Sequence, residues 1–175
     1  MIQTPLRLGI AGLGTVGVGV LKIINKNAAL ISLRAGRDVV VSAVSARSRT
    51  KDRGVNLSSL PWEDDPVALA MREDVDVFVE LIGGSDGPAK AATKAAIAAG
   101  KDVVTANKAM LAVHGQSLAL AAESVGQVIR FEAAIAGGIP VVKALTEGLA
   151  GNEINRVLGV MNGSCNYILT RMESS

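Results

Sequence analysis

Short apolar runs alternate along this chain with longer, alanine-rich segments in which apolar residues recur at helical spacing. The short runs predict buried strands at residues 6–11, 38–44, 75–80, 102–105, 128–131 and 153–161. The helical spacing predicts helices at residues 15–25, 66–71, 88–99, 114–124, 139–149 and 166–172, with the polar stretch 51–65 as a loop. This alternation predicts an α/β fold in which a doubly wound, mostly parallel sheet carries helices on both faces.

The composition agrees with such a fold. Hydrophobic residues make up 49% of the 175 residues and aromatic residues only 2%, so the core must consist of alanine, valine, isoleucine and leucine. These residues suit a parallel sheet, because its strands are buried on both faces. A chain of this length forms one domain, or one domain and the start of a second.

Charge and cysteine content exclude several classes of protein. The net charge of +2 is too small, and the aromatic residues are too few, for a nucleic-acid partner. The single cysteine, Cys165, excludes a disulfide framework within the chain and fits a reducing compartment. No apolar stretch approaches the roughly 20 residues of a membrane helix, and the N-terminus does not read as a signal peptide. We therefore expect a soluble, cytoplasmic protein without a membrane partner.

A glycine-rich turn joins the first predicted strand to the first predicted helix. Its sequence is Gly12-Leu13-Gly14-Thr15-Val16-Gly17, and in this setting the pattern G-x-G-x-x-G indicates a dinucleotide site of the Rossmann type. Gly12 permits the tight turn, Gly14 lets a pyrophosphate approach the backbone, and Gly17 lets helix and strand pack closely. The free N–H groups and the dipole of the helix favour the phosphates. Residues 1–150 are therefore predicted to form a dinucleotide-binding domain.

The end of the second predicted strand bears on the choice of coenzyme. In NAD enzymes an acid at this place binds the hydroxyls of the adenine ribose, but here the strand runs without an acid into Arg47, Ser48 and Arg49. The two arginines are placed to bind a 2′-phosphate, with the Ser48 hydroxyl as a further donor. The sequence therefore favours NADP. NAD is the alternative coenzyme if the arginines are ordinary solvated loop residues.

Four further segments narrow the range of families to which the sequence can be compared. They are Val79-Glu80-Leu81-Ile82-Gly83-Gly84, Val104-Thr105-Ala106-Asn107-Lys108, Glu132-Ala133-Ala134-Ile135-Ala136-Gly137-Gly138-Ile139-Pro140 and Met161-Asn162-Gly163-Ser164-Cys165-Asn166-Tyr167-Ile168-Leu169. Together with the glycine turn, and in this order and spacing, they resemble homoserine dehydrogenase from residue 6 to residue 172. The resemblance implies hydride transfer with NAD(P) that interconverts L-aspartate 4-semialdehyde and L-homoserine, in the biosynthesis of threonine, methionine and isoleucine.

The resemblance also implies roles for individual residues. The cofactor would contact the glycine turn and the ends of the third and fourth strands, at Gly12, Gly14, Thr15, Val16, Gly17, Ile82, Gly83 and Thr105. Lys108 matches the catalytic lysine that this family places near nicotinamide and substrate, where it could hold the carbonyl oxygen or relay a proton. Gly163 and Ser164 match the turn that contacts the substrate. The family more often reads N-G-T-T-N-Y-I-L here, so Ser164 keeps a hydroxyl, whereas Cys165 loses one and is given no role.

The resemblance further implies a cation and a second domain. The family binds a monovalent cation, usually sodium, mainly through backbone oxygens, and the matching positions are Glu132, Ile135, Gly137 and Ile139. Residues 151–175 would begin the substrate and catalytic domain, truncated at Ser175, with a second catalytic lysine and acidic substrate ligands further along. We therefore expect negligible homoserine oxidation by the 175-residue chain, and a homodimer for the full-length protein.

Two alternatives stay open at this point. The chain could belong to another Rossmann oxidoreductase that acts on an amino-acid semialdehyde, and substrate profiling of the complete protein would separate the two. It could also be a non-catalytic nucleotide-binding sensor if Ser175 is the natural C-terminus.

Overall fold

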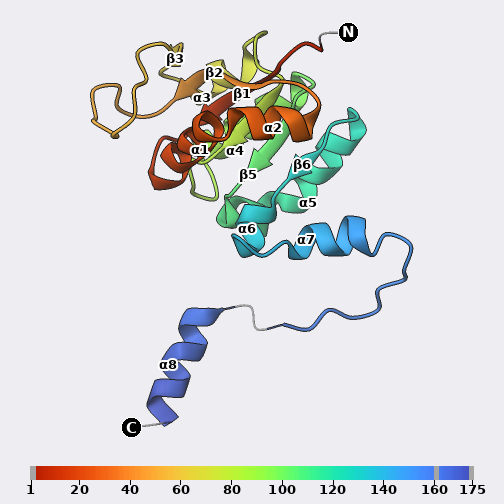
Figure 1. The fold of residues 1–175 in the computed structure, drawn as a ribbon. Coiled ribbons are helices and arrows are strands. Elements are labelled where there is room, and N and C mark those ends of the chain that lie inside the picture. Colours follow the sequence, from red (N-terminus) through yellow and green to blue (C-terminus); the bar gives the residue numbers. More distant parts are fainter. Residues whose placement is uncertain (1–2, 160–161, 174–175) are drawn as a thin grey trace. The chain divides into compact units, whose positions relative to one another are not determined.

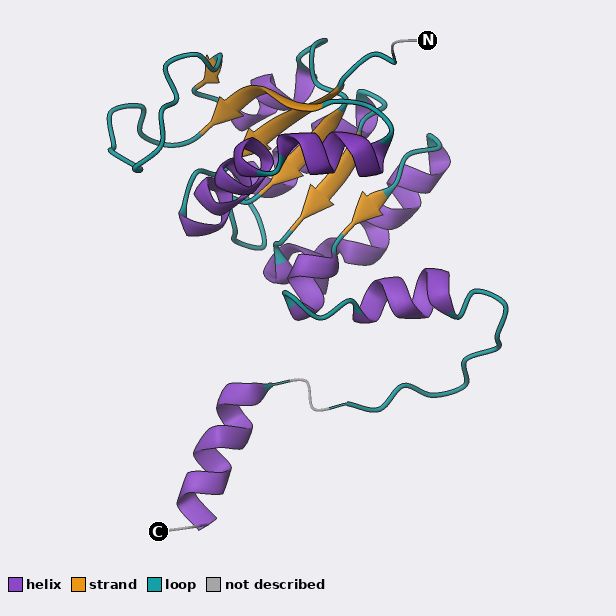
Figure 2. Cartoon of the chain, in the orientation of Figure 1, coloured by secondary structure: helices purple, strands orange, loops and turns teal. Residues whose placement is uncertain are grey.

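The computed structural model describes residues 3–159 and 162–173, and the chain divides into two units, Met1–Val142 and Lys143–Ser175. The strands of the first unit are β1 (Leu6–Ala11), β2 (Val39–Ser45), β3 (Trp62–Glu63), β4 (Val77–Glu80), β5 (Asp102–Thr105) and β6 (Ile129–Arg130). Its helices are α1 (Thr15–Lys26), α2 (Ala28–Ala35), α3 (Pro66–Met71), α4 (Pro88–Ala98), α5 (Lys108–Ser124) and α6 (Glu132–Ala136). Helices lie on both sides of the sheet (Figures 1 and 2), which confirms the predicted α/β fold.

The sheet is parallel throughout its described strands, with the order β3-β2-β1-β4-β5-β6. The chain builds outward from β1 to β3, then crosses back to place β4 on the other side of β1. Ligands of open α/β sheets bind at such a switch point, beyond the carboxyl ends of the strands. The last residues of four strands pair there in one row, in the order Ser45, Ala11, Glu80 and Thr105.

Alternate residues of β1, β2 and β4 belong to two separate cores. Ile10, Val44 and Val79 pack with Leu21 of α1 on one face of the sheet. Their neighbours face the other way and pack against α3, α4 and α5; they include Ala11, Ala43, Phe78 and Val103. Both faces of the sheet are thus buried, which is why its strands appear in the sequence as continuous apolar runs.

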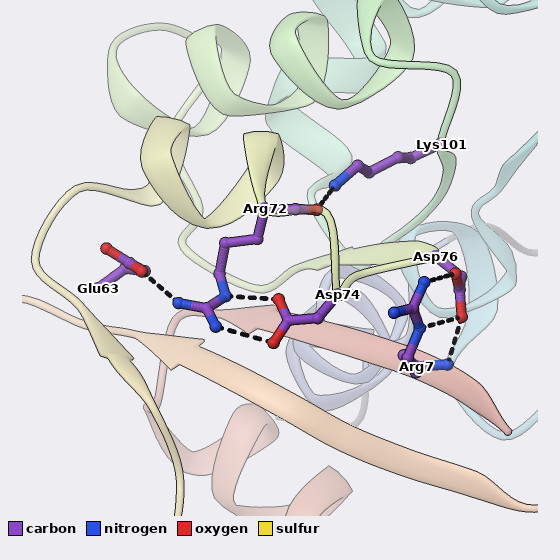
Figure 3. Close-up of polar contacts among 6 residues, drawn as sticks. All are labelled: Arg7, Glu63, Arg72, Asp74, Asp76 and Lys101. Atoms are coloured by element: carbon purple, nitrogen blue, oxygen red, sulfur yellow. Dashed lines mark hydrogen bonds and ion pairs between the residues drawn. The ribbon is translucent and has the colours of Figure 1, made fainter.

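A network of charged side chains joins the loops around α3 to the sheet (Figure 3). Asp76 accepts hydrogen bonds from the backbone N, Nε and Nη2 of Arg7 in β1 at 2.8, 3.0 and 2.7 Å. Arg72 donates to Asp74 at 2.7 and 2.8 Å and to Glu63 at 2.5 Å. Hydrogen bonds from the two arginines lower the pKa values of Asp76 and Asp74. These contacts tie β1, β3 and the entry to β4 together.

The structure adds helix α2, which the hydrophobic pattern did not predict. Asn27 ends α1 and begins α2, and Gly36 ends α2 with φ +73°. No residue of α2 is buried, so it leaves no apolar stripe in the sequence. Within the described residues no single helix is long and apolar enough to cross a membrane; only the bent pair of α1 and α2, which turns by 81°, passes that test by length and composition.

Several predicted boundaries were wrong. Helix α5 begins at Lys108 rather than at residue 114, because the Asn107 side chain caps it by accepting a hydrogen bond from Met110 N at 3.1 Å. The fifth predicted strand, residues 128–131, is shorter in the structure, where β6 covers only Ile129–Arg130. The two-residue strand β3 lies in the predicted loop, and α6 was not predicted. In place of a single helix at residues 139–149, the chain forms α7 (Val141–Lys143) and a π-helical turn, η1 (Ala144–Gly148).

The second unit contains η1 and α8 (Gly163–Glu173), which includes the helix predicted at residues 166–172. The strand predicted at residues 153–161 is wrong for residues 153–159, which form no strand; residues 160–161 lie outside the described residues. A strand requires a partner for its backbone hydrogen bonds. The described part of this unit contains no other strand that could provide them.

Candidate nucleotide-binding site

The glycine turn connects β1 to α1 at the switch point of the sheet. Gly12 has φ +99°, and a Cβ atom there would lie 2.3 Å from the carbonyl oxygen of Leu81. A Cβ atom at Gly17 would lie 2.0 Å from the carbonyl oxygen of Gly12. By contrast, a Cβ atom at Gly14 would meet nothing within 4 Å. The fold itself therefore requires the first and third glycines, whereas the second leaves space for a ligand.

The N-terminus of α1 faces this space without a protein cap. Gly14 occupies the N-cap position, no side chain caps the helix, and its first turn contains no acidic residue. The first N–H groups of a helix have no partner within the helix and carry the positive end of its dipole. Thr15 and Val16 of this turn are exposed. The turn can therefore bind an anionic group such as a diphosphate.

A cavity of about 540 Å³ opens in front of the turn. Three segments form most of its wall: the glycine turn at residues 12–14, residues 45–48 with Lys51 and Arg53 after β2, and residues 81–83 after β4. Asp64, Pro66 and Pro88 complete it. The volume lies within the usual range of small-molecule sites. The three strand ends thus contribute to one concave site.

Positive charge collects at the β2 end of the cavity. Arg47, Lys51 and Arg53 line it there together with Ser48. Asp64 is the acidic residue among the lining side chains, and its Oδ1 accepts a hydrogen bond from Trp62 Nε1 at 2.9 Å. Arg49 does not line the cavity and is exposed. This end of the cavity suits a phosphate group.

Arg53 connects the loop after β2 to the glycine turn. Its Nε donates to the carbonyl oxygen of Leu13 at 3.1 Å, Nη1 to that of Lys51 at 2.9 Å and Nη2 to that of Ser48 at 2.6 Å. The guanidinium also lies over the Trp62 ring, 5.6 Å from its centroid. A single planar side chain thereby fixes the path of the basic loop relative to the phosphate-binding turn.

Hydrogen bonds to the buried side chain of Glu80 fix the loop after β4. Its Oε1 accepts hydrogen bonds from the backbone N–H groups of Ile82 and Gly83 at 2.7 and 3.1 Å. Its Oε2 accepts one from the Thr105 hydroxyl at 2.6 Å. Ile82 and Gly83 line the cavity, whereas Glu80 and Thr105 are buried beneath it.

The turn after β5 leads into α5 and carries Lys108. Asn107 caps the helix and also donates from Nδ2 to the carbonyl oxygen of Gly84 at 2.8 Å, so this turn is tied to the loop after β4. Lys108 is exposed and lines a second hollow, of about 470 Å³, between α5, β6 and α6. Apolar residues form most of its wall, among them Leu111, Ile129 and Phe131. Lys108 therefore lines this second hollow and not the cavity in front of the glycine turn.

Polar contacts of Asp86 hold the loop between β4 and α4. Asp86, in the loop before α4, lies 2.9 Å from His114 Nε2 in α5 and 3.0 Å from Lys90 Nζ in α4. Hydrogen bonds from Lys90, His114 and Ser85 lower the pKa of Asp86 to about 2. The loop that follows Gly83 is thereby fastened to two helices.

The predicted site residues fall into distinct places. Those that line the cavity are Gly12, Gly14, Arg47, Ser48, Ile82 and Gly83. Gly17 and Thr105 are buried, and the predicted substrate-binding pair, Gly163 and Ser164, opens α8 in the second unit. Of the predicted cation ligands, Glu132 and Ile135 belong to α6, and Gly137 and Ile139 follow it. The side chain of Glu132 accepts a hydrogen bond from Val142 N at 3.0 Å.

Sequence reasoning missed three side chains of this site. Lys51 and Arg53 lie in a stretch without hydrophobic periodicity, so only the folded path of the loop brings them to the cavity. Glu80 lies in the segment 79–84, one of those that carry the family resemblance, but the resemblance implies no role for it. An acid at the end of a fully apolar strand is a usable signal, because a buried carboxylate needs hydrogen-bond partners near it.

Comparison with known proteins identifies the family. The model "Homoserine dehydrogenase, NAD binding domain" matches residues 12–132, and the model "Homoserine dehydrogenase" matches residues 140–175. The chain belongs to the homoserine dehydrogenase family. It carries the NAD-binding domain of that family, so its cofactor is a nicotinamide dinucleotide.

Individual members of the family resemble the chain over almost all of its length. It is 46% identical to the homoserine dehydrogenase of Neisseria gonorrhoeae over 168 residues and 44% identical to that of Pseudomonas aeruginosa over 168 residues. These matches cover 96% of the chain but 38% of each relative. The structure of homoserine dehydrogenase from Thiobacillus denitrificans superimposes with a TM-score of 0.88 at 42% identity, over 98% of this chain and 39% of the other. The chain thus spans less than half the length of these relatives.

Proposed function

We propose that the chain binds NADP(H) in the cavity between the glycine turn and the loop after β2. The diphosphate would lie at the N-terminus of α1, against Gly14, Thr15 and Val16. The 2′-phosphate of the adenine ribose would lie among the basic side chains of the loop. One observation carries this proposal: Arg47, Lys51 and Arg53 line the same cavity as the glycine turn. The place after β2, where NAD enzymes have an acid, is occupied by Arg47 and Ser48.

The two neighbouring arginines provide a matched pair of variants for the coenzyme preference. Arg47→Ala removes a cation that lines the cavity, whereas Arg49→Ala removes an exposed one that does not. Hydrogen bonds to charged groups are worth about 1.5–3 kcal/mol, so Arg47→Ala should weaken NADPH binding by about tenfold or more and leave NADH binding unchanged. Calorimetric titration of both coenzymes measures this. Equal losses in the two variants, or none in Arg47→Ala, would contradict the assignment.

We propose further that the complete protein interconverts L-aspartate 4-semialdehyde and L-homoserine. The nicotinamide coenzyme supplies or accepts the hydride. Lys108 follows β5 at the carboxyl edge of the sheet, and its ammonium group is suited to holding the substrate carbonyl oxygen and its developing negative charge. Gly163 and Ser164 would contact the amino-acid part of the substrate. We also propose that the complete protein is a cytoplasmic homodimer; the unpaired, exposed Cys165 is compatible with a reducing compartment.

The 175-residue chain allows coenzyme binding to be tested separately from catalytic turnover. Because it spans 38% of its curated relatives, we expect it to bind the coenzyme and to show negligible oxidation of homoserine. Steady-state assays of this chain and of the complete protein, followed by absorbance of the reduced coenzyme, compare the two. In the complete protein, Lys108→Met should lower kcat/KM by about a hundredfold or more, the usual cost of one transition-state contact. Turnover by the chain alone, or full activity of Lys108→Met, would refute these assignments.

A monovalent cation is proposed near α6, held by the backbone carbonyls of Glu132, Ile135, Gly137 and Ile139. Ile135 lies in the last turn of α6, where carbonyl oxygens lack partners within the helix, and Gly137 and Ile139 follow that turn. Backbone oxygens are ligands that a hard cation prefers. The Ile139 oxygen also accepts a hydrogen bond from Val141 N at 2.8 Å and would have to use its second lone pair. Sodium chloride should raise the melting temperature of the chain above that in choline chloride at equal ionic strength. Equal melting curves in the two salts would argue against the site.

A further inference from the structure

Glu80 is a carboxylate in the interior of the protein. It ends β4, and none of its surface is exposed. Burying an unpaired charge is strongly unfavourable, so a carboxylate in this position must be satisfied by hydrogen bonds. Within the described residues its partners are neutral donors and include no lysine, arginine or histidine.

Three donors converge on the two oxygens of Glu80. Oε1 accepts from Ile82 N at 2.7 Å and from Gly83 N at 3.1 Å, and Oε2 accepts from Thr105 Oγ1 at 2.6 Å. The Thr105 hydroxyl oxygen itself accepts a hydrogen bond from Asn107 N at 3.0 Å. Its proton is therefore available to Glu80, and all contacts suit an acceptor-only carboxylate.

The carboxylate also decides what the loop after β4 can bind. Successive backbone N–H groups in a glycine-rich turn commonly form a concave anion site. Here the N–H groups of Ile82 and Gly83 are occupied from inside the protein by Glu80. This leaves the glycine turn before α1 as the diphosphate site, and an ionised Glu80 would place a negative charge at the end of β4.

The Glu80 carboxylate lies on the side of the sheet where the nicotinamide half of the coenzyme is expected. In a sheet of order 3-2-1-4-5-6 the dinucleotide crosses the switch point, with one nucleotide on each half of the sheet. Arg47, Lys51 and Arg53 identify the β2 side with the adenine ribose phosphate. The ends of β4 and β5, which Glu80 and Thr105 join, remain for the nicotinamide half.

We propose that Glu80 is a positioning residue for the coenzyme. It fixes the loop after β4 to the turn after β5, and its negative charge favours the oxidised, cationic nicotinamide over the reduced, neutral one. This inference rests on the proposed coenzyme binding. It concerns a residue that does not line the cavity and acts through Ile82, Gly83 and Thr105.

The decisive measurement is the ratio of the affinities of NADP⁺ and NADPH in Glu80→Gln. Glutamine keeps the size and most of the hydrogen bonds and removes the charge. Binding of NADP⁺ should weaken about tenfold and binding of NADPH by less than about twofold, the order of magnitude for one unit charge at an effective dielectric constant of about 20. The control is Glu73→Gln, the same change at an exposed residue before β4, which should leave both affinities unchanged. An unchanged ratio in folded Glu80→Gln would overturn the proposal.

A second variant separates position from charge. Thr105→Val keeps the carboxylate and removes its link to β5, so both forms of the coenzyme should bind about threefold more weakly at an unchanged ratio. Wild-type binding by Thr105→Val would overturn the positioning role, including the case in which Glu80→Gln does not fold. Absence of any coenzyme binding by the wild-type chain would instead refute the proposed function on which the inference rests.

Discussion

The second glycine of the turn offers the sharpest test of the site, because the structure separates its role from those of its neighbours. Gly14 has φ −81°, which any residue adopts, and a Cβ atom there would have no neighbour within 4 Å. Alanine is a poorer N-cap than glycine but lowers the entropy of the unfolded chain, and each effect is worth about 0.5–1 kcal/mol. The free energy of unfolding of Gly14→Ala should therefore stay within about 0.5 kcal/mol of wild type.

Ligand binding by Gly14→Ala should change far more. The added methyl group would project into the space in front of the first N–H groups of α1, and hydrogen bonds to a charged phosphate are worth about 1.5–3 kcal/mol each. Displacing the diphosphate from one of them predicts a loss of about tenfold to 150-fold in NADPH affinity. Urea unfolding followed by far-UV circular dichroism, together with calorimetric titration, measures both quantities.

Gly17→Ala is the matched control, with the opposite expected result. Its Cβ atom would lie 2.0 Å from a backbone oxygen, about 1 Å inside the closest contact that Cβ atoms make. Overpacking of this kind costs about 3 kcal/mol, and the gain in helix propensity returns about 1 kcal/mol, which leaves a net loss of about 2 kcal/mol. If Gly14→Ala bound NADPH as wild type does, or if it lost as much stability as Gly17→Ala, the diphosphate assignment would be refuted.

Three further variants test the elements that support the site. Asn107→Ala removes the cap of α5 and the bond to Gly84, and should lower the free energy of unfolding by about 2 kcal/mol in urea titrations. Arg53→Lys keeps the charge but loses the planar fork that holds three carbonyl oxygens, so calorimetry should show NADPH binding about threefold to tenfold weaker. Hydrogen bonds from Arg7 lower the pKa of Asp76 below its ordinary 3.8, so their stabilisation is present above about pH 4 and is lost as the pH falls through the folded pKa. Asp76→Asn should accordingly flatten the fall in unfolding free energy below about pH 4, and an unaltered acid profile would remove the pair from this account.

The sequence predicts the elements that bury an apolar surface and fails for those that do not. β1, α3 and β5 appear at their predicted bounds, because each buries apolar residues in the cores beside the sheet. Helix α2 has no buried residue and β3 has two residues, so neither leaves a periodic signal. The start of α5 depends on one side chain, Asn107, which caps the helix. Asparagine is equally common in turns, so the sequence alone does not show that a helix begins there.

The residues of the candidate site also fall into those that the sequence predicts and those that it does not. The glycine turn was predictable because its residues are consecutive and their roles follow from local backbone geometry. Arg53 and Glu80 were not, since each acts on atoms that the fold brings from elsewhere. Arg53 reaches Leu13 across 40 positions of sequence, and Glu80 reaches Thr105 across 25. Contacts of this range depend on the strand order, which hydrophobic patterning alone does not determine.

The charges along the carboxyl edge of the sheet give the proposed site a direction. Ser45, Ala11, Glu80 and Thr105 pair in one row across the edge, so an elongated dinucleotide could in principle lie along it either way round. With the adenine ribose phosphate at the β2 end, its negative charge meets the basic loop and the nicotinamide half meets buried Glu80. The reverse orientation would bring the 2′-phosphate toward a carboxylate and the cationic ring toward the basic loop, and like charges at such distances repel. On the proposed NADP binding, the electrostatic asymmetry of the edge would therefore favour the orientation that presents the nicotinamide half toward the turn that carries Lys108.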